Sequence, residues 1–477
     1  MTPLREVAAR RADAVALRWA GQQVLSYARL FELVDQLELR LKAKGIGPGS
    51  AIALHLTNVP AFLIAVIAAS ELGATVMPLD PLLPKGELAT LVAALSPSMV
   101  LTQSSTAVVP GAAHWQLDDL AQLVSESGGQ LPRHELLEGA AFIQWSSGST
   151  GRPKGILISG DALWACAQHI QQAVALDDDE RTLCSVPLTH SHGLDCLAFP
   201  TLLGGGTVWL MPPATATPMS VLSLLTSERI SFFSSVPSFF AVCNRLQSTT
   251  QYDLSALRRP FCGSAALSRT VAEGFLERFG RPLQQGYGLA EIGVICLHEH
   301  QHPPYLFETV GRPMAPIRWR LDQNELIVSS AALCSGHLSD GTVDSSPFAS
   351  GELRTGDLVA VDEAGRFFIT GRMNQVINVA GQKVNPAEVE TALRNLSWVK
   401  EVAVIGAPDS LTGECVAAYL VADRGPSTLD DAALRKLAMP ELRERLAEFK
   451  LPRHWHFRDA LPKSPLGKVL KPKLTES

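Results

Sequence analysis

The stretch that most strongly indicates the fold reads Ser146-Ser147-Gly148-Ser149-Thr150-Gly151-Arg152-Pro153-Lys154-Gly155. It follows the apolar residues 141–145, which we interpret as a buried strand. Glycines let backbone N–H groups turn toward an anion, hydroxyls add hydrogen-bond donors, and a lysine supplies a mobile positive charge. The order differs from the Walker loop, because Pro153 precedes the lysine and Gly155 follows it. The stretch predicts a polyphosphate-binding loop, with a flexible Gly/Ser surface loop as the alternative.

Length and composition indicate a folded protein of more than one domain. The 477 residues exceed what one ordinary hydrophobic core supports, and 46% of them are apolar and 18% charged. The net charge of −6, without basic runs that carry interleaved aromatic residues, argues against a nucleic-acid partner. The eight cysteines form no CxxC pair, which favours reduced thiols over a disulfide or zinc framework.

We expect neither a targeting segment nor a transmembrane segment. The first residues lack the apolar core of a signal peptide. The most apolar stretch, 61–70, is about half the ~20 residues that a membrane span needs. The predicted location is the cytoplasm, and the sequence does not indicate an oligomeric state.

Helical and strand patterns alternate through the first part of the chain and again after the glycine-rich stretch. Before that stretch, helices are predicted at 27–44, 60–72 and 87–95, and strands at 51–56, 75–77 and 99–102. Such alternation favours an α/β fold with a mostly parallel sheet and helices on both faces.

The pattern changes in the last third of the chain. Short apolar pieces between turns around 310–350 predict a small β-barrel region. Two strand patterns and a charged amphipathic helix over about 429–449 predict a compact α+β domain at the C-terminus. We therefore predict a large N-terminal domain, 1–373, built of α/β subdomains and the barrel region, and a small C-terminal domain, 374–477.

Four further segments carry unusual chemistry. They read Gln285-Gly286-Tyr287-Gly288-Leu289-Ala290-Glu291, Gly351-Glu352-Leu353-Arg354-Thr355-Gly356-Asp357-Leu358, Gly371-Arg372 followed by the turn-rich block 379–390, and Leu461-Pro462-Lys463-Ser464-Pro465-Leu466-Gly467-Lys468. With the phosphate loop they make five motifs, and in this order and spacing the chain resembles the adenylate-forming superfamily. That superfamily comprises acyl- and aryl-CoA synthetases, peptide-synthetase adenylation domains and luciferases. The resemblance covers nearly the whole chain.

The resemblance implies a two-step reaction and a mobile C-terminal domain. A carboxylic acid attacks the α-phosphate of ATP to give acyl-AMP and pyrophosphate, and a thiol then displaces AMP to give a thioester. The implied cofactors are ATP and Mg²⁺, with CoA or phosphopantetheine as the co-substrate. The implied partners are a small carboxylic acid and, where phosphopantetheine is the acceptor, an acyl carrier protein.

The resemblance also assigns residues to the nucleotide. The β- and γ-phosphates would be held by Ser146, Ser147, Gly148, Ser149, Thr150, Gly151 and Lys154, and Mg²⁺ by Glu291. The adenine slot and the rest of the nucleotide motif would involve Gly263, Ser264, Ala265, Gln285, Gly286, Tyr287, Gly288 and Ala290. Asp357 would accept both ribose hydroxyls, and Arg372 would add a donor. Ala290 departs from the superfamily's usual threonine, which removes one hydroxyl donor near the α-phosphate, worth roughly 1 kcal/mol.

The remaining assignments concern the acid and the thiol. Lys468 would bridge the attacking carboxylate and the α-phosphate, and His190 would gate the acid site, with a packed, non-catalytic histidine as the alternative. Asn374 stands at the hinge, and Val379, Ala380 and Gly381 would line the thiol tunnel. Ala380 replaces the first glycine of the superfamily's usual Gly-Gly pair, and Gly381 retains the second. Lys463 and Lys471 would meet a CoA phosphate or belong to a solvated surface.

The acid is predicted to be fatty or aryl rather than an amino acid. Asp195 falls after Gly193 and is poorly placed to hold an ammonium group, whereas apolar or small residues such as Phe199 and Ser235 suit an uncharged tail.

Three alternatives stay open: an acyl-AMP ligase that loads only a carrier protein, a catalytically idle binding protein on the same fold, and a phosphotransferase that releases ADP. The alternating residues His298, His300 and His302 are interpreted as an exposed loop rather than a metal site.

Overall fold

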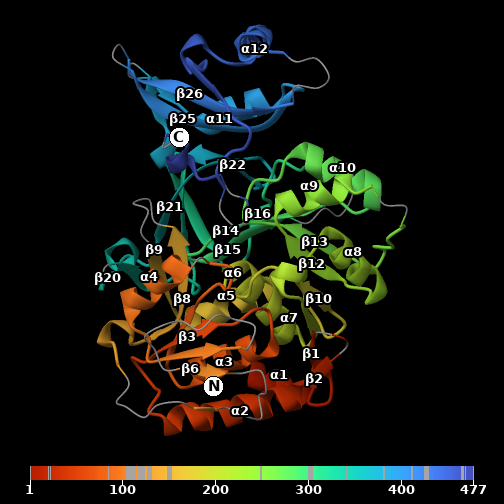
Figure 1. Cartoon of the computed structure of the whole chain (residues 1–477), viewed down its shortest axis with the longest axis vertical. Coiled ribbons are helices and arrows are strands. Elements are labelled where there is room, and N and C mark those ends of the chain that lie inside the picture. Colours follow the sequence, from red (N-terminus) through yellow and green to blue (C-terminus); the bar gives the residue numbers. More distant parts are fainter. Residues whose placement is uncertain are drawn as a thin grey trace. The chain divides into compact units, whose positions relative to one another are not determined.

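The structure is a computed structural model, and it describes residues 2–19, 21, 23–83, 85–103, 114–116, 124–125, 132–147, 153–247, 250–298, 305–339, 341–379, 382–409, 412–423, 429–463, 467 and 469–475 (Figure 1). The chain packs as two compact units. The first unit comprises Met1–Trp319 and Val328–Leu353, and the second comprises Arg320–Ile327 and Arg354–Ser477. This division groups residues by packing. The domain boundary that we predict between residues 373 and 374, with the hinge at Asn374, concerns motion and stays a prediction.

In the described part of the first unit, one nine-stranded sheet has the order β20-β19-β9-β8-β4-β3-β5-β6-β7. The strands are β3 Ala51–His55, β4 Thr75–Pro78, β5 Met99–Thr102, β6 His114–Gln116, β7 Val124–Ser125, β8 Ala140–Ser147, β9 Pro153–Ser159, β19 Gly336–Ser339 and β20 Thr342–Asp344. Strands β3, β4 and β5 are parallel and buried along their whole length, which explains their nearly continuous apolar sequence. Helices α2 (Tyr27–Ala43), α3 (Pro60–Glu71) and α4 (Lys85–Leu95) alternate with them as predicted.

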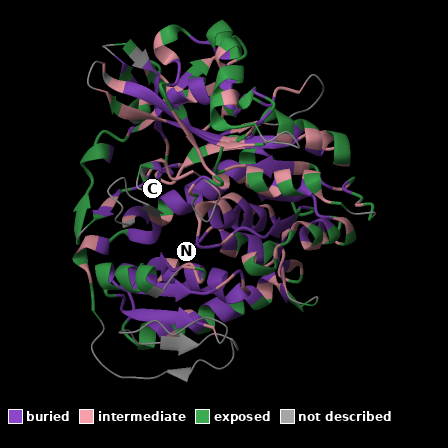
Figure 2. Ribbon diagram, turned by 45° about the horizontal axis from the view of Figure 1, so that its top comes forward, coloured by how far each residue is buried: buried purple, intermediate pink, exposed green. Residues whose placement is uncertain are grey.

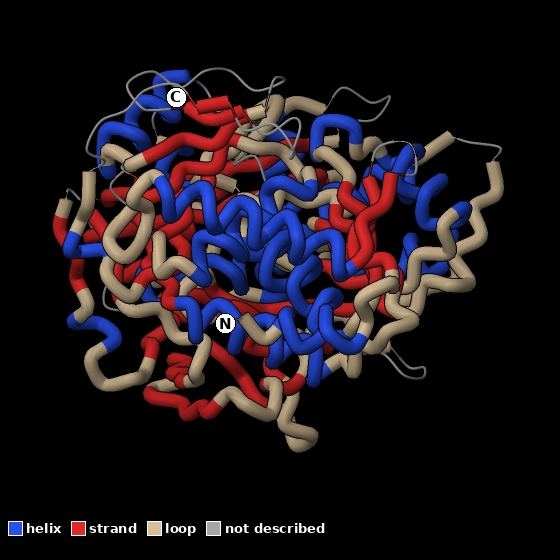
Figure 3. Tube along the Cα trace, turned by 90° about the horizontal axis from the view of Figure 1, so that it is seen from below, coloured by secondary structure: helices blue, strands red, loops and turns tan. Residues whose placement is uncertain are grey.

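A second sheet, also nine-stranded among the described residues, has the order β16-β15-β14-β13-β12-β10-β11-β1-β2. Its strands are β1 Val15–Trp19, β2 Gln23–Ser26, β10 Arg181–Cys184, β11 Thr207–Leu210, β12 Phe232–Ser235, β13 Arg259–Cys262, β14 Gln284–Leu289, β15 Gly293–His298 and β16 Arg312–Pro313. The helices between these strands are α5 (Gly160–Ala173), α7 (Phe199–Gly204), α8 (Pro218–Ser227), α9 (Pro237–Arg245) and α10 (Arg269–Phe279). Figure 2 shows buried residues along the strands and exposed residues on helix faces and loops, and Figure 3 shows helices lying over strands.

A buried carboxylate links the starts of three central strands of the second sheet, β13, β12 and β10. The Glu180 side chain is 0% exposed, and its Oε2 lies 2.6 Å from Nη1 of Arg259 and 3.2 Å from Nη2 of Arg258. The hydroxyl of Ser231 donates to Oε1 of the same carboxylate. Because Glu180 precedes β10, Ser231 precedes β12 and Arg259 begins β13, this network fixes the starts of three neighbouring strands.

A four-stranded sheet follows, in the order β17 (Arg318–Asp322), β18 (Glu325–Ser329), β21 (Leu353–Val361) and β22 (Phe367–Arg372). Gln323 and Asn324 join the first two strands with φ of 49° and 65°, as a type I′ hairpin turn requires. We predicted a small β-barrel in this part of the chain, whereas the described strands form an open order.

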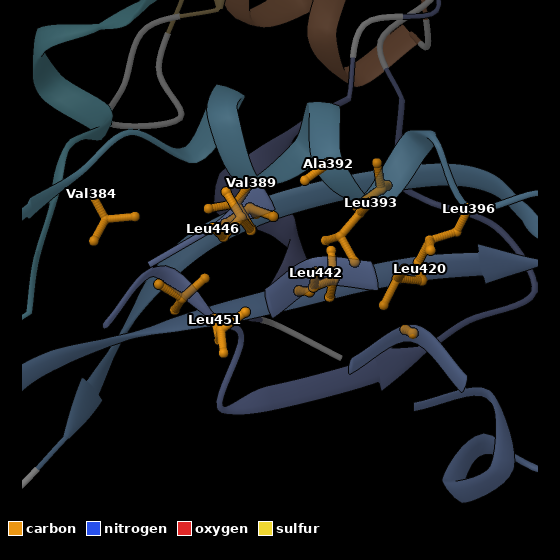
Figure 4. Packing of buried hydrophobic residues seen from close by; sticks show 14 of the residues in the cluster. Val384, Val389, Ala392, Leu393, Leu396, Leu420, Leu442, Leu446 and Leu451 are labelled. Carbon is orange, nitrogen blue, oxygen red and sulfur yellow. The ribbon is translucent and has the colours of Figure 1, made fainter. Parts of the chain in front are cut away.

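The C-terminal part of the second unit is an α+β domain built on one sheet. Its described strands have the order β24 (Gln382–Val384), β23 (Ile377–Val379), β26 (Gly413–Ala422) and β25 (Val399–Asp409), and β27 (His454–Phe457) pairs with β26. Helix α11 (Pro386–Arg394) begins at Asn385, whose side chain accepts a hydrogen bond from Ala387 N, and Pro386 suits the first helical position. Figure 4 shows Val389 and Leu393 of α11 packed with Leu420 of β26 and Leu442 of α12 (Asp431–Arg445).

Candidate active site

The predicted phosphate loop joins two antiparallel strands, β8 and β9. Ser146 lies opposite Lys154 and Ser147 opposite Pro153, so the ends of the loop are held together by a strand ladder. Residues 148–152 lie outside the described residues, as do the side chains of Ser146 and Ser147. The glycine after the lysine has a packing reason, since a Cβ on Gly155 would come within 2.9 Å of Ile143 Cγ2 and 3.3 Å of Leu338 Cβ.

Glu291, the predicted Mg²⁺ ligand, lies in the tight connection between β14 and β15. Its Oε1 is 3.3 Å from Nε2 of His337 on β19, and its backbone carbonyl accepts a hydrogen bond of 2.7 Å from Cys334 N. Burial alone would raise the pKa of Glu291, but the hydrogen bond with His337 and the positive charge of Lys154 outweigh it and hold the pKa below its ordinary value. Glu291 is therefore an anion near neutral pH, and it lies close enough to Lys154 to be influenced by its charge.

The residues present fit a magnesium ion bound together with nucleotide. No group of three His, Cys, Asp or Glu side chains among the described residues forms a metal site by itself. Mg²⁺ is usually held by one or two carboxylates and by substrate phosphates rather than by an all-protein cage. A single ionised carboxylate beside a phosphate loop matches that donor set.

The nucleotide motif on β14 is shaped by its hairpin partner. Tyr287 pairs with Cys296, and a register irregularity follows between Tyr287 and Gly288. A Cβ on Gly288 would lie 2.2 Å from Gly293 O, so only glycine fits there. The Gln285 side chain donates to the carbonyls of Phe307 and Thr309 at 2.6 and 3.1 Å, and these hydrogen bonds hold the segment 307–309 against β14. Its predicted contact with nucleotide stays a prediction.

The segment Gly263-Ser264-Ala265 follows β13 and carries a residue in the left-handed region. Ser264 has φ of 65°, a backbone conformation that serine rarely adopts. Its Oγ lies 3.0 Å from Nδ1 of His192, and Nε2 of the same ring lies 2.7 Å from Oγ of Ser234 at the end of β12. Burial, followed by the charge of His190, lowers the pKa of His192 to about 4, so the ring is neutral and links the two hydroxyls.

Sequence reasoning selected His190 and missed His192. His190 lies 3.5 Å from the Gln144 side chain through Nδ1, and Ser191 N donates to Gln144 Oε1 at 3.0 Å. Burial lowers the pKa of His190, opposed in part by Asp80. The gating role of His190 stays a prediction. His192 stands in the same segment, 187–194, as His190, but what marks it is its pair of hydroxyl partners on β12 and after β13, which the local sequence does not reveal.

Asp357 and Arg372, both assigned to the ribose, are cross-strand partners on β21 and β22. The Arg372 Nε lies 2.6 Å from Asp357 Oδ1, and its Nη2 lies 3.4 Å from Oδ2. Asp357 is 2% exposed, so the arginine compensates a buried carboxylate. The structure thus brings this predicted pair together, although its contact with nucleotide stays a prediction.

The predicted residues of the C-terminal domain are described only in part. Lys468, Ala380 and Gly381 lie outside the described residues, as does the side chain of Asn374. Val379 is buried on β23.

The two lysines considered for a CoA phosphate are paired inside this unit. Lys463 Nζ is 2.6 Å from Glu401 Oε1, and Lys471 Nζ is 2.7 Å from Glu390 Oε1. Each lysine therefore has a carboxylate partner in this unit, and its contact with a CoA phosphate stays a prediction. His298 of the histidine run lies on β15, and the other two lie outside the described residues.

None of the helices in the described ranges combines the length and the apolar character that crossing a membrane would require.

The fold and these motifs define a two-unit α/β enzyme of the adenylate-forming class. Residues 4–330 match the AMP-binding enzyme family, and residues 388–468 match the AMP-binding enzyme C-terminal domain. The chain belongs to the AMP-binding enzyme family. The predictions of this superfamily, of an α/β fold with a large and a small domain, and of an AMP-forming acid–thiol ligase are confirmed.

Known relatives resemble the chain over nearly its whole length. It is 32% identical over 475 residues to feruloyl-CoA synthase of Amycolatopsis sp, which covers 96% of this chain and 94% of that protein. It is 26% identical over 476 residues to long-chain-fatty-acid--CoA ligase FadD13 of Mycobacterium tuberculosis, covering 95% and 93%. The solved structure of amide bond synthetase McbA from Marinactinospora thermotolerans superposes with a TM-score of 0.83 at 26% identity, covering 99% of both chains.

Proposed function

We propose that the chain activates a carboxylic acid with ATP and then transfers the acyl group to the thiol of CoA. In the first step a carboxylate oxygen bonds to the α-phosphorus and the bond to the bridging oxygen breaks, which releases pyrophosphate. In the second step the thiolate attacks the acyl carbonyl, and AMP leaves. The observation that carries the proposal is that the phosphate-loop hairpin and the Glu291 turn converge, so that Lys154 and His337 both act on Glu291.

The electrostatic problem of the first step explains these residues. Two like charges ~4 Å apart repel by about 4 kcal/mol at an effective dielectric constant near 20. Lys154 offsets charge at the β- and γ-phosphates, and Lys468 does so between the acid and the α-phosphate. Glu291 holds Mg²⁺, which supplies further positive charge when bound. Charges fixed in place before the reaction lower the barrier without reorganisation.

The acid is of the aryl or fatty class. The relatives named feruloyl-CoA synthase and long-chain-fatty-acid--CoA ligase support this range. Asp195 is unsuited to holding an ammonium group, because it is buried, accepts a hydrogen bond of 2.9 Å from Ser191 Oγ, and has its pKa raised to about 6 by burial. Phe199 and Ser235 are both buried, and their apolar or small side chains suit an uncharged tail.

The further parts of the proposal concern motion and acceptor. The C-terminal domain, 374–477, turns about Asn374 between the two steps, which withdraws Lys468 and brings Val379, Ala380 and Gly381 to the thiol. CoA is the acceptor, and the phosphopantetheine of a carrier protein is the second candidate because it offers the same thiol arm. The reaction takes place in the cytoplasm.

Product analysis tests this function. A library of aryl and fatty acids is screened for pyrophosphate release, and products with CoA and with a carrier protein are identified by mass spectrometry. AMP, pyrophosphate and an acyl-CoA are expected. ADP would indicate a phosphotransferase, and no nucleotide turnover with any acid would indicate an idle binding protein.

The half-reactions test the proposed role of Lys468. We expect Lys468→Ala to abolish adenylation while thioester formation from supplied acyl-AMP is largely retained. Equal loss of both half-reactions would contradict a domain swing that removes this lysine before the second step.

A further inference from the structure

His337 lies on β19, outside every motif that the sequence brought forward, yet its ring meets the predicted metal ligand. We propose that His337 is a positioning residue for the nucleotide's divalent cation, because it holds the Glu291 carboxylate in place near Lys154. The proposal rests on the proposed function, in which Glu291 holds Mg²⁺ together with ATP.

The polarity of the contact between His337 and Glu291 is fixed by chemistry. An ionised carboxylate accepts hydrogen bonds and cannot donate them, so the His337 Nε2–H donates to Glu291 Oε1 across 3.3 Å. His337 engages Oε1 of this carboxylate, which also receives a backbone hydrogen bond from Glu291 itself. An ionised carboxylate offers about four lone-pair sites, so acceptor capacity is left for a cation.

The backbone of Glu291 is held from the same direction. Cys334 N donates to its carbonyl at 2.7 Å, and Cys334 lies in the turn that leads into β19. One segment, 334–337, thus fixes both the main chain and the side chain of Glu291. Because both the main chain and the side chain are held, the position of the carboxylate is fixed, as a metal ligand requires.

The ring of His337 is itself held on several sides. The backbone of His337 pairs in register with Ile156 on β9 and with Asp344 on β20, which fixes the base of the side chain. The ring packs edge-on against Phe348, with ring centroids 4.8 Å apart. Its side chain is 11% exposed. A Cβ on Gly336 would come within 2.8 Å of Val343 Cγ1, so β19 and β20 approach closely at this point.

The register of β9 adds a cation to this arrangement. Lys154 stands two residues before Ile156, the partner of His337, so Lys154 and His337 project from the same face of the sheet. A donor, a carboxylate and an ammonium group therefore surround the place where the loop would deliver polyphosphate. A histidine that served only to fill space would not need a nitrogen directed at Glu291.

Two variants separate orientation from packing. His337→Phe keeps the ring against Phe348 and removes the donor, whereas His337→Gln retains a donor. The affinity for a non-hydrolysable ATP analogue is measured by calorimetry with and without Mg²⁺, in the absence of acid. We expect His337→Phe to lower the affinity measured with Mg²⁺ about tenfold and to leave the metal-free affinity unchanged, with His337→Gln close to wild type. His456→Phe, a ring stacked on Tyr419 in the second unit, is the matched control and should bind as wild type does.

A double-mutant cycle decides whether His337 acts through Glu291. In a Glu291→Gln background, His337→Phe should cause no additional loss of affinity. Equal losses with and without Mg²⁺, an undiminished loss in the Glu291→Gln background, or no loss at all would overturn the inference while the proposed function stands. A wild-type chain that binds no nucleotide would overturn both.

Discussion

Glu180 and Glu291 are both partly or wholly buried carboxylates beside strands of the second sheet, but their surroundings differ. Glu180 is 0% exposed at its side chain and is bound by Arg258, Arg259 and the Ser231 hydroxyl. Glu291 is 25% exposed at its side chain and accepts a hydrogen bond from His337 at one carboxylate oxygen. A carboxylate whose acceptor capacity is filled by protein stabilises the fold, whereas one with capacity left over is available to a ligand.

The largest effect is expected from removing a partner of Glu180, the carboxylate whose acceptor capacity is filled by protein groups. Arg259→Met leaves the buried Glu180 without its closest guanidinium, which should lower the free energy of unfolding by about 3–5 kcal/mol. Urea denaturation measures the loss, and the folded fraction should keep its adenylation rate per molecule. Arg29→Met, which removes an ion pair with Glu32 that is exposed on both sides, is the control and should cost less than about 1 kcal/mol. Equal losses of unfolding free energy for the two variants would show that the buried pair with Glu180 stabilises the fold no more than an exposed pair does.

The second effect concerns catalysis instead of stability. Glu291→Gln removes the charge that holds Mg²⁺ and should slow adenylation about 100-fold, equivalent to ~2.7 kcal/mol, with little change in unfolding free energy. Pyrophosphate exchange measures the rate. Glu308→Gln, at an exposed carboxylate paired with Arg269, is the control. If Glu291→Gln instead unfolded the chain and left the rate unchanged, the contrast with Glu180 would be wrong.

The sequence predicted the local features of these regions better than the contacts between them. Gly155 and Gly288 were placed in motifs, and the structure gives their reason, since a Cβ at either would collide with a neighbouring strand. The alternation of helices and strands also followed from local apolar patterns. By contrast, His337 meets Glu291 from 46 residues away and His192 meets Ser264 from 72, and such pairings depend on sheet order.

The C-terminal region shows the same limit of sequence reasoning. Lys463 and Lys471 were considered as ligands for phosphate, but each reaches a carboxylate of its own unit. The barrel was expected from short strands separated by turns, and that pattern does not distinguish a closed barrel from an open sheet.

A third variant, with a smaller expected effect, tests whether Lys471 supports catalysis indirectly. Lys463 pairs with Val469 in an isolated antiparallel bridge, and Leu470 N donates to Pro462 O at 2.8 Å. Residues 462–463 and 469–470, which flank Lys468 in the sequence, are therefore joined to each other. Lys471 then contacts Glu390 Oε1 at 2.7 Å and Val404 O at 3.0 Å. Lys471→Met should therefore slow adenylation about tenfold, or ~1.4 kcal/mol, by loosening the segment that carries Lys468.

The control for this variant is a lysine that pairs with the same helix, α11. Lys450 pairs with Glu388 of α11 at 2.6 Å, so Lys450→Met removes a comparable ion pair without touching the segment around Lys468. It should leave adenylation near the wild-type rate. Thioester formation from supplied acyl-AMP should be nearly unchanged in both variants. A matching loss of adenylation in Lys450→Met would assign the effect to general loosening of the domain.

The smallest effect is a pH dependence at the hydroxyl-linked ring of His192. Its pKa is about 4 in the folded chain against 6.5 for an ordinary histidine, so between these values the unfolded chain binds more protons. Stability is therefore lost as pH falls through this window, by about 1 kcal/mol between pH 7 and 5 after allowance for solvent screening. Asp195, with its pKa raised to about 6, has the opposite sign. The measurement is therefore the difference in unfolding free energy between wild type and His192→Gln, which cancels the contribution of Asp195. A difference that stays constant from pH 7 to 5 would show that His192 is not held neutral between Ser234 and Ser264.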